Sequence, residues 1–292
     1  MSGTRFKYLR PEDIRRLQSY EFAPRIFAEG YLSGRHRSRH RGSSIEFRDY
    51  RQYVPGDDLA LVDWRVFART DRHYLRTFEQ ETNMECHIFL DSSASMGFRH
   101  NDLSKLEYAS FFAAALAWLV VRHGDRVSLQ VFDDQIRHFS PPGSTQRHLH
   151  TLMHVLEDNA PGNPTSIANA LRRSHPLLTR RGTLVVVSDF LDDAGAVFSA
   201  LSPYLHRGFR IHLVHLLTPG ELDLRSAGLH TFIDMETGER VVAHAGQIRE
   251  AYRQAMQDHI GGLRAAAARR RVDYCLATID THHYRLFDRF SQ

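Results

Sequence analysis

The chain has 292 residues, of which 42% are hydrophobic and 25% charged, as is ordinary for a soluble globular protein with a substantial core. Its formal net charge is +4, and the excess lies near the N-terminus, where residues 1–76 contain 16 Lys/Arg against 10 Asp/Glu. The most apolar stretch, Phe111–Val121, is too short to span a bilayer and the N-terminus has no apolar signal region, so the sequence predicts a cytoplasmic protein without a membrane span.

Much of the positive charge lies in the run Gly34–Gly42, GRHRSRHRG. Such a run could bind nucleic acid through the phosphate backbone. Because it has no interleaved aromatic residues and no DNA-binding motif, we favour a solvated or partner-facing segment. We expect it to form part of a basic lead segment at residues 1–82, followed by the main domain at residues 83–292.

The two cysteines, Cys86 and Cys275, both lie in apolar runs that are typical of strands. This placement suits buried, reduced thiols in a cytosolic protein, and a disulfide between them stays open as an alternative. No cysteine pair with the spacing of a zinc site exists.

From residue 86 onward, apolar runs typical of strands alternate with helical patterns. Strands are predicted at Cys86–Leu90, Arg126–Phe132, Leu184–Ser188, Ile211–Leu217 and Val272–Thr278. Helices are predicted at Lys105–Arg122, Thr145–Asp158, Ser166–Leu178, Ala194–His206 and Gly246–Arg271. This order is the signature of βαβ units, so we expect a doubly wound, Rossmann-like α/β fold with a mostly parallel sheet.

Two shorter features complete the pattern. His138-Phe139 is a candidate edge strand that the break Pro141-Pro142-Gly143 would end, and His230–Val242 contains a plausible hairpin turn, ETGE. The helix Lys105–Arg122 is apolar nearly all round, which predicts that it packs centrally against the sheet.

The stretch Asp91–Gly97, DSSASMG, directly follows the first predicted strand. Right-handed crossovers place the carboxyl ends of all parallel strands at one edge, where ligands bind in such sheets. Oxygen-bearing side chains come to this edge from three segments: Asp91, Ser93 and Ser95; Thr165; and Asp189. Two carboxylates with hydroxyls form an incomplete shell for Mg²⁺, and a partner protein's carboxylate could fill the open position.

The pattern D-x-S-x-S with a later Thr and a strand-end Asp resembles the metal-ion-dependent adhesion site of von Willebrand factor A domains. The lead segment resembles the hallmark of a large bacterial family catalogued as domain of unknown function fifty-eight, in the motifs Ser44–Asp58, Val62-Asp63-Trp64 and Ala68-Arg69-Thr70. The resemblance covers nearly the whole chain. Members of that family are von Willebrand A-like, and their genes commonly neighbour MoxR-type AAA+ ATPases.

The resemblance implies roles for the five residues at the sheet edge. Ser93 and Ser95 would ligate the ion directly, Thr165 directly in the partner-bound state, and Asp91 and Asp189 directly or through water. It implies Mg²⁺ as the ion, with Mn²⁺ or Ca²⁺ as alternatives. It also implies a protein-binding adaptor or co-chaperone that acts with a MoxR-type ATPase. Asp192 and Asp193 add negative charge close to this site and could affect ion preference.

Each of these positions also has a purely structural interpretation. Asp91-Ser92-Ser93 could form an Asx-type turn or a helix cap, Thr165 an N-cap, and Asp189 a solvated strand end. Their joint appearance at one sheet edge favours the metal site.

In the lead segment, Pro55-Gly56-Asp57 has turn chemistry and Trp64 offers an apolar body. Charge pairs could form among Arg51, Asp58, Asp63 and Arg69. We favour a brace for the main domain over a binding role.

The sequence does not predict an enzyme. A haloacid-type phosphatase would use Asp91 as nucleophile but wants a second Asp where this chain has Ser93. The serine-hydrolase pattern G-x-S-x-G and the nucleotide-binding pattern G-x-x-x-x-G-K-[ST] are both absent. A metal-dependent phosphohydrolase that uses Asp91 is kept as the alternative.

Overall fold

The computed structural model describes most of the chain: residues 6–18, 45–52, 62–80, 84–224 and 228–290. The chain divides into two compact units, one of residues 34–83 and the other of residues 1–33 together with 84–292. No helix within the described ranges is long and apolar enough to cross a membrane.

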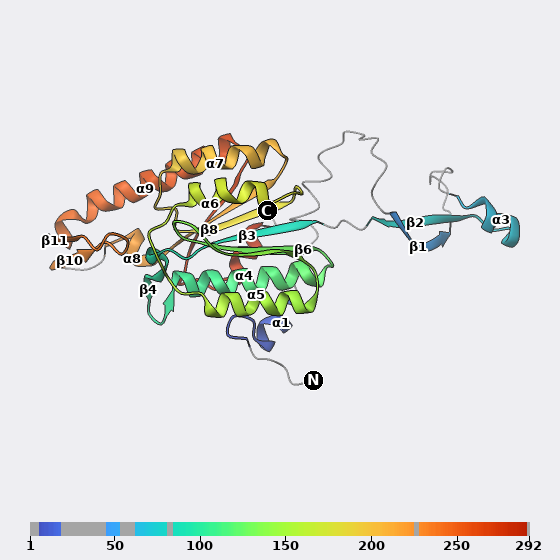
Figure 1. The fold of residues 1–292 in the computed structure, drawn as a ribbon, viewed down its shortest axis with the longest axis horizontal. Helices are drawn as coiled ribbons and strands as arrows, with labels where there is room; N and C mark the ends of the chain where they lie inside the picture. The colour runs from blue at the N-terminus through green and yellow to red at the C-terminus, as the bar shows by residue number, and fades with distance from the viewer. Residues whose placement is uncertain (1–5, 19–44, 53–61, 81–83, 225–227, 291–292) are drawn as a thin grey trace. The chain divides into compact units, whose positions relative to one another are not determined.

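A six-stranded sheet forms the centre of the larger unit, with the strand order β12-β9-β8-β3-β6-β7 (Figure 1). The strands are β3 (Glu85–Asp91), β6 (Arg126–Phe132), β7 (Ile136–Gly143), β8 (Thr183–Ser188), β9 (Arg210–Leu217) and β12 (Asp273–Thr278). Five strands run parallel, and the edge strand β7 pairs antiparallel with β6. The predicted doubly wound, mostly parallel sheet is therefore confirmed.

Helices cover both faces of this sheet (Figure 1). The core on one face contains residues of α1 (Pro11–Gln18), α4 (Lys105–Arg122), α5 (Gln146–Asp158) and α10 (Tyr284–Phe290). The core on the other face contains residues of α6 (Ile167–Ser174), α7 (Ala194–His206) and α9 (Ala245–Arg269). Alternate side chains of each inner strand enter opposite cores, because successive residues of a strand point to opposite faces.

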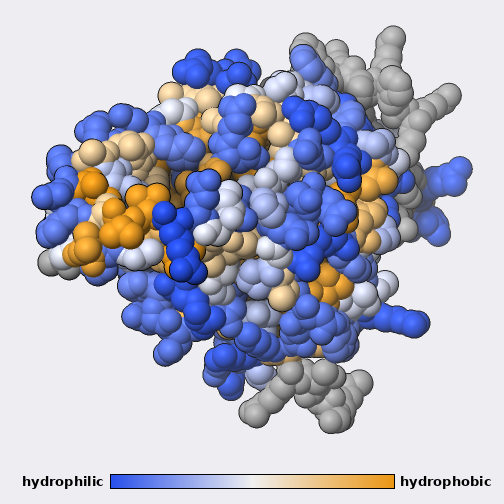
Figure 2. Space-filling view, turned by 60° about the vertical axis from the view of Figure 1, so that its left-hand side comes forward, coloured by the Kyte–Doolittle hydropathy of each residue, from blue (hydrophilic) through white to orange (hydrophobic). Residues whose placement is uncertain are grey.

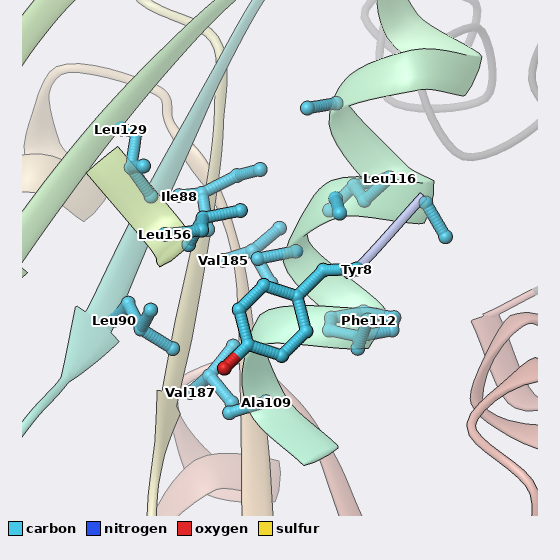
Figure 3. Close-up of a cluster of buried hydrophobic side chains, with 14 of the residues drawn as sticks. Tyr8, Ile88, Leu90, Ala109, Phe112, Leu116, Leu129, Leu156, Val185 and Val187 are labelled. Atoms are coloured by element: carbon cyan, nitrogen blue, oxygen red, sulfur yellow. The ribbon is translucent and has the colours of Figure 1, made fainter. Parts of the chain in front are cut away.

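The helix α4 is buried along most of its length, as its apolar sequence predicts. A capping box starts it: the Ser104 hydroxyl accepts from the backbone N–H of Glu107, and the Glu107 carboxylate accepts from the backbone N–H of Ser104. Figure 3 shows the apolar side chains of β3, β6 and β8 that share a core with Phe112 and Leu116 of α4. These strand residues are Ile88, Leu90, Leu129, Val185 and Val187.

Residues 6–18 pack on this core, although the sequence analysis grouped them with the lead segment. The side chains of Phe6, Tyr8 and Leu17 are buried, and the Tyr8 ring meets the Phe111 ring edge-on at 5.0 Å. The sequence of residues 6–18 does not indicate that they pack on α4. The two segments are about a hundred residues apart and come together only in the folded chain.

The edge strand β7 is longer than predicted. We expected a strand at His138-Phe139 that ends before Pro141, but β7 continues through both prolines to Gly143. Proline lacks a backbone N–H and is tolerated at a sheet edge or a bulge. Both conditions hold here, since β7 has a single neighbour and its register with β6 shifts between Val127 and Leu129.

The shorter elements of the larger unit lie near the carboxyl ends of the strands. They are β4 (Arg99–His100), β5 (Leu103–Ser104), α8 (Pro219–Leu222), β10 (Leu229–Ile233) and β11 (Arg240–His244). β10 and β11 pair antiparallel, which confirms the predicted hairpin.

The smaller unit contains β1 (Ile45–Gln52), α3 (Trp64–Thr70) and β2 (Tyr74–Gln80), and β1 pairs antiparallel with β2. Asp63 is the N-cap of α3, because its Oδ1 accepts from the backbone N–H of Arg65 at 2.9 Å and of Val66 at 3.4 Å. This cap is a local role for a residue that we expected in a charge pair.

Several lead-segment predictions fall outside what the structure describes. These are the basic run Gly34–Gly42, the turn Pro55-Gly56-Asp57, and the charge pairs through the side chains of Arg51 and Asp58. The bracing role of the lead segment stays a prediction.

Replacing Phe112 by Ala should lower the free energy of unfolding by about 3–5 kcal/mol, because the ring is fully buried and packs 5.1 Å from the Phe287 ring. Denaturant titration followed by circular dichroism measures this loss. The control is Leu177→Ala at an exposed position, where a change under about 0.5 kcal/mol is expected. A similar loss in both variants would contradict the central place of α4 in the core.

Candidate metal site

The topology brings two strand ends together at the centre of the sheet. β3 lies between β6 and β8, and Asp91 ends β3 while Asp189 directly follows β8. From β3 the chain continues first to β6, which pairs with one edge of β3, and later returns to β8, which pairs with its other edge. Open α/β sheets bind ligands in the crevice at such a switch point, outside the carboxyl ends of the strands.

The loop after β3 is fixed by backbone hydrogen bonds to its neighbours. Ser92 donates from its backbone N–H to the Phe132 carbonyl at 2.7 Å, and its own carbonyl accepts from Gly162 at 2.8 Å. The backbone N–H of Ala94 donates to the Asn163 carbonyl at 3.1 Å. The hydroxyls that follow Asp91 are thus held by β6 and by the loop before α6, rather than by their own chain alone.

The five predicted site residues converge at this point. Asp91 Oδ2 accepts from Thr165 Oγ1 at 3.1 Å, and Ser93 Oγ lies 3.1 Å from Ser95 Oγ. Asp189 lies close enough that its charge, after burial, helps to raise the pKa of Asp91. Two carboxylates and three hydroxyls therefore gather at one sheet edge, although they come from three segments of the chain.

Of the structural interpretations, the Asx-type turn at Asp91 is confirmed, whereas the N-cap at Thr165 and the solvated strand end at Asp189 are wrong. Thr165 does not cap α6, because its hydroxyl donates to Asp91, while the N–H of Ile167 donates to Asp192 Oδ2 at 3.1 Å. Asp189 is fully buried rather than solvated. Asp91 does form an Asx-type turn, since its Oδ1 accepts from the backbone N–H of Ser93 at 2.9 Å, and its Oδ2 faces the other side chains.

The acidic residues after Asp189 have local roles as well. Asp192 accepts from the first turn of α6, and Asp193 is the N-cap of α7, where its Oδ1 accepts from the backbone N–H of Gly195 at 2.9 Å. Their effect on ion preference stays a prediction.

Burial controls the electrostatics of the two central carboxylates. Burial first, and then the charge on Asp189, raise the pKa of Asp91 to about 7. Burial would also raise the pKa of Asp189, but the Lys105 ammonium 2.7 Å from its Oδ2 holds that pKa below its usual value. The two carboxylates are therefore more stable beside a cation than as two uncompensated negative charges.

Lys105 is a site residue that the sequence analysis missed. Its side chain is fully buried, and its Nζ lies 2.7 Å from Asp189 Oδ2 and 2.5 Å from Glu221 Oε1 in α8. Burial alone would lower the pKa of Lys105, but these two carboxylates raise it. One signal was present in the sequence: a lysine in the first turn of an apolar helix opposes the helix dipole and calls for an acidic partner.

Two further side chains reach the site. Ser188 Oγ donates to Asp91 Oδ2 at 2.6 Å, and Glu236, in the turn between β10 and β11, accepts from the backbone N–H of Thr165 at 3.2 Å. Burial first, and also the charge on Asp189, raise the pKa of Glu236, while the hydrogen bond from the Thr165 N–H opposes that rise. Nothing local in the sequence indicates that Glu236 reaches this sheet edge.

The donor set fits a small, hard cation. In an octahedral Mg²⁺ shell with ligands at about 2.0–2.1 Å, neighbouring oxygens lie about 2.9 Å apart. The Asp91–Thr165 and Ser93–Ser95 oxygen pairs, both at 3.1 Å, are close to this spacing. No three His, Cys, Asp or Glu side chains in the described part of the chain form a metal cluster by themselves, so hydroxyls must supply part of the shell.

The model of a family described as "Protein of unknown function DUF58" matches residues 49–261. The uncharacterized proteins Mb1516 of Mycobacterium bovis and Rv1480 of Mycobacterium tuberculosis are each 27% identical to this chain over 228 residues, which is 76% of this chain and 70% of theirs.

Two solved structures of low sequence identity align with most of the chain. The conserved hypothetical protein BatB from Bacteroides thetaiotaomicron has a TM-score of 0.48 and 17% identity, over 71% of this chain and 97% of its own. An aerotolerance-related membrane protein from Bacteroides fragilis has a TM-score of 0.49 and 20% identity, over 72% of this chain and 97% of its own.

Replacing Lys105 by Met should lower the free energy of unfolding by about 3–5 kcal/mol, because it leaves Asp189 and Glu221 without their shared cation. Denaturant titration in the presence of chelator measures the loss. Arg249→Met is the control, since it breaks the exposed ion pair with Asp223 and should change stability little. Equal stability of the two variants would show that Lys105 is not needed to neutralise the buried carboxylates.

Proposed function

Because the chain belongs to the family described as protein of unknown function DUF58, whose description assigns no activity, we propose a function from the site itself. We propose that the protein is a von Willebrand A-like adaptor or co-chaperone that binds Mg²⁺ at the switch point of its sheet. A partner protein would bind there through an Asp or Glu side chain. The observation that carries this proposal is the convergence of Asp91, Ser93, Ser95, Thr165 and Asp189.

Each residue would contribute to binding in its own way. The Ser93 and Ser95 hydroxyls would hold the ion directly, and Thr165 would turn its hydroxyl from Asp91 toward the ion when a partner is bound. Asp91 and Asp189 would balance its charge, directly or through water. When bound, Mg²⁺ would supply an electrophilic centre for a carboxylate from outside the chain.

The charges at the site support a cation there. The carboxylates of Asp91, Asp189, Glu221 and Glu236 lie at or next to the switch point, and Lys105 forms ion pairs with two of them. A divalent ion would offset much of the remaining negative charge. Mn²⁺ or Ca²⁺ would satisfy the same oxygens, and the preference for Mg²⁺ is part of the proposal.

The proposed partner class has a separate basis. A MoxR-type AAA+ ATPase is proposed from the family resemblance, whereas a cytoplasmic location stays an expectation from the sequence. The chemistry of the site asks only for a protein with an accessible carboxylate.

No observation favours the alternative of a phosphohydrolase that uses Asp91. The Asp91 side chain is fully buried, and both of its oxygens already accept hydrogen bonds. Ser93, moreover, stands where a phosphatase of the haloacid type has its second Asp.

Isothermal titration with Mg²⁺ tests the proposal. The wild type should bind one ion, and Asp91→Asn should bind it at least tenfold more weakly, because the amide keeps the shape of the side chain but removes its charge. Asp258→Asn is the matched control: it makes the same change at an exposed position of α9 and should leave the affinity within about twofold. Indistinguishable heats for the wild type and Asp91→Asn would overturn the metal site.

A further inference from the structure

The turn between β10 and β11 brings its own carboxylate to the open side of the candidate metal site. Glu236 Oε1 accepts from the backbone N–H of Thr165 at 3.2 Å. Glu236 therefore contacts one of the five candidate ligands, Thr165, although it lies 71 positions after it in the chain.

The turn is built to hold Glu236 in this position. Asp234 Oδ1 accepts from the backbone N–H groups of both Glu236 and Thr237, each at 2.8 Å. Gly238 has φ = +74°, a conformation that strains other residues, and it closes the turn by donating to the Asp234 carbonyl at 2.9 Å. Local hydrogen bonds thus fix the backbone of the turn at Glu236.

The same turn covers the loop that carries the serine ligands. A side-chain carbon placed on Gly97, at the end of the serine loop, would lie 3.6 Å from the Met235 methyl group. The turn therefore lies against the end of the loop that carries Ser93 and Ser95.

The strands behind this turn are held only weakly. Leu229, Ile233, Val241 and Val242 each expose more than half of their surface, so little apolar area would be lost if the hairpin moved. Figure 2 shows hydrophobic side chains gathered on the side of the molecule where β10 and β11 lie. The Glu236 carboxylate in the turn is held by a hydrogen bond, whereas the strands of the hairpin bury little apolar surface.

We infer that Glu236 is the acidic ligand that this chain supplies to its own metal site. It takes the position that a partner's carboxylate would otherwise fill, so a partner must displace the hairpin in order to bind. This inference rests on the proposed function. It adds a residue outside every motif to the ligand set, and it makes the β10–β11 hairpin the element that partner binding must move.

Titration with Mg²⁺ alone tests the inference on the full chain, with a matched pair of variants. Glu236→Gln should bind Mg²⁺ about tenfold more weakly than the wild type, because the amide still accepts from Thr165 but brings no charge to the ion. Glu239→Gln makes the same change in the same turn, at an exposed residue, and should stay within about twofold. Equal weakening in both variants, or in neither, would overturn the assignment.

Hydrogen exchange provides a second readout. Adding Mg²⁺ should slow amide exchange in residues 229–244 of the wild type and of Glu239→Gln, but not of Glu236→Gln, since only a bound Glu236 carboxylate ties the hairpin to the ion. The two proposals fail separately. If the wild type binds no Mg²⁺, the metal site and the role of Glu236 both fall. If Asp91→Asn loses the ion while Glu236→Gln keeps full affinity, only the role of Glu236 falls.

Discussion

Two buried carboxylates, Asp91 and Asp189, lie near each other at the ends of adjacent strands in the centre of the sheet, and the surrounding structure compensates for their charge. Neither side chain is exposed to water, so each negative charge must be met by hydrogen bonds or by a cation. Lys105 forms an ion pair with Asp189, and hydroxyls and a backbone N–H donate hydrogen bonds to Asp91. A site with this excess of negative charge, in which hydroxyl oxygens lie 3.1 Å apart, is well suited to a small divalent ion.

The candidate ligands differ in how firmly the fold holds them. Asp91 and Asp189 come from strands inside the sheet, and α4 carries Lys105 at a fully buried position. The β10–β11 hairpin that brings Glu236 buries little apolar surface. Under the proposed function, a partner would displace the hairpin without disturbing the core, because the sheet holds the other ligands.

The central fold could be predicted because its elements have strong local signals. The inner strands are continuous apolar runs, as expected for strands buried on both faces, and α4 is apolar nearly all round. Local signals did not predict the features that depend on contacts between distant parts of the chain. Pro141 and Pro142 indicate a break, but an edge strand with a shifted register accommodates them. The packing of residues 6–18 depends on a helix about a hundred positions away.

The sequence by itself determined the strand order along the chain, the helices between the strands and the five oxygen-bearing residues that strand ends or loops would bring to one sheet edge. Periodicity and turn chemistry act over a few residues, so a single sequence displays them directly. Only the tertiary structure decided that Ser188, Lys105, Glu221 and Glu236 join those five. Their roles arise from charges and hydrogen bonds between segments that are up to 116 positions apart, and such interactions exist only after the chain has folded.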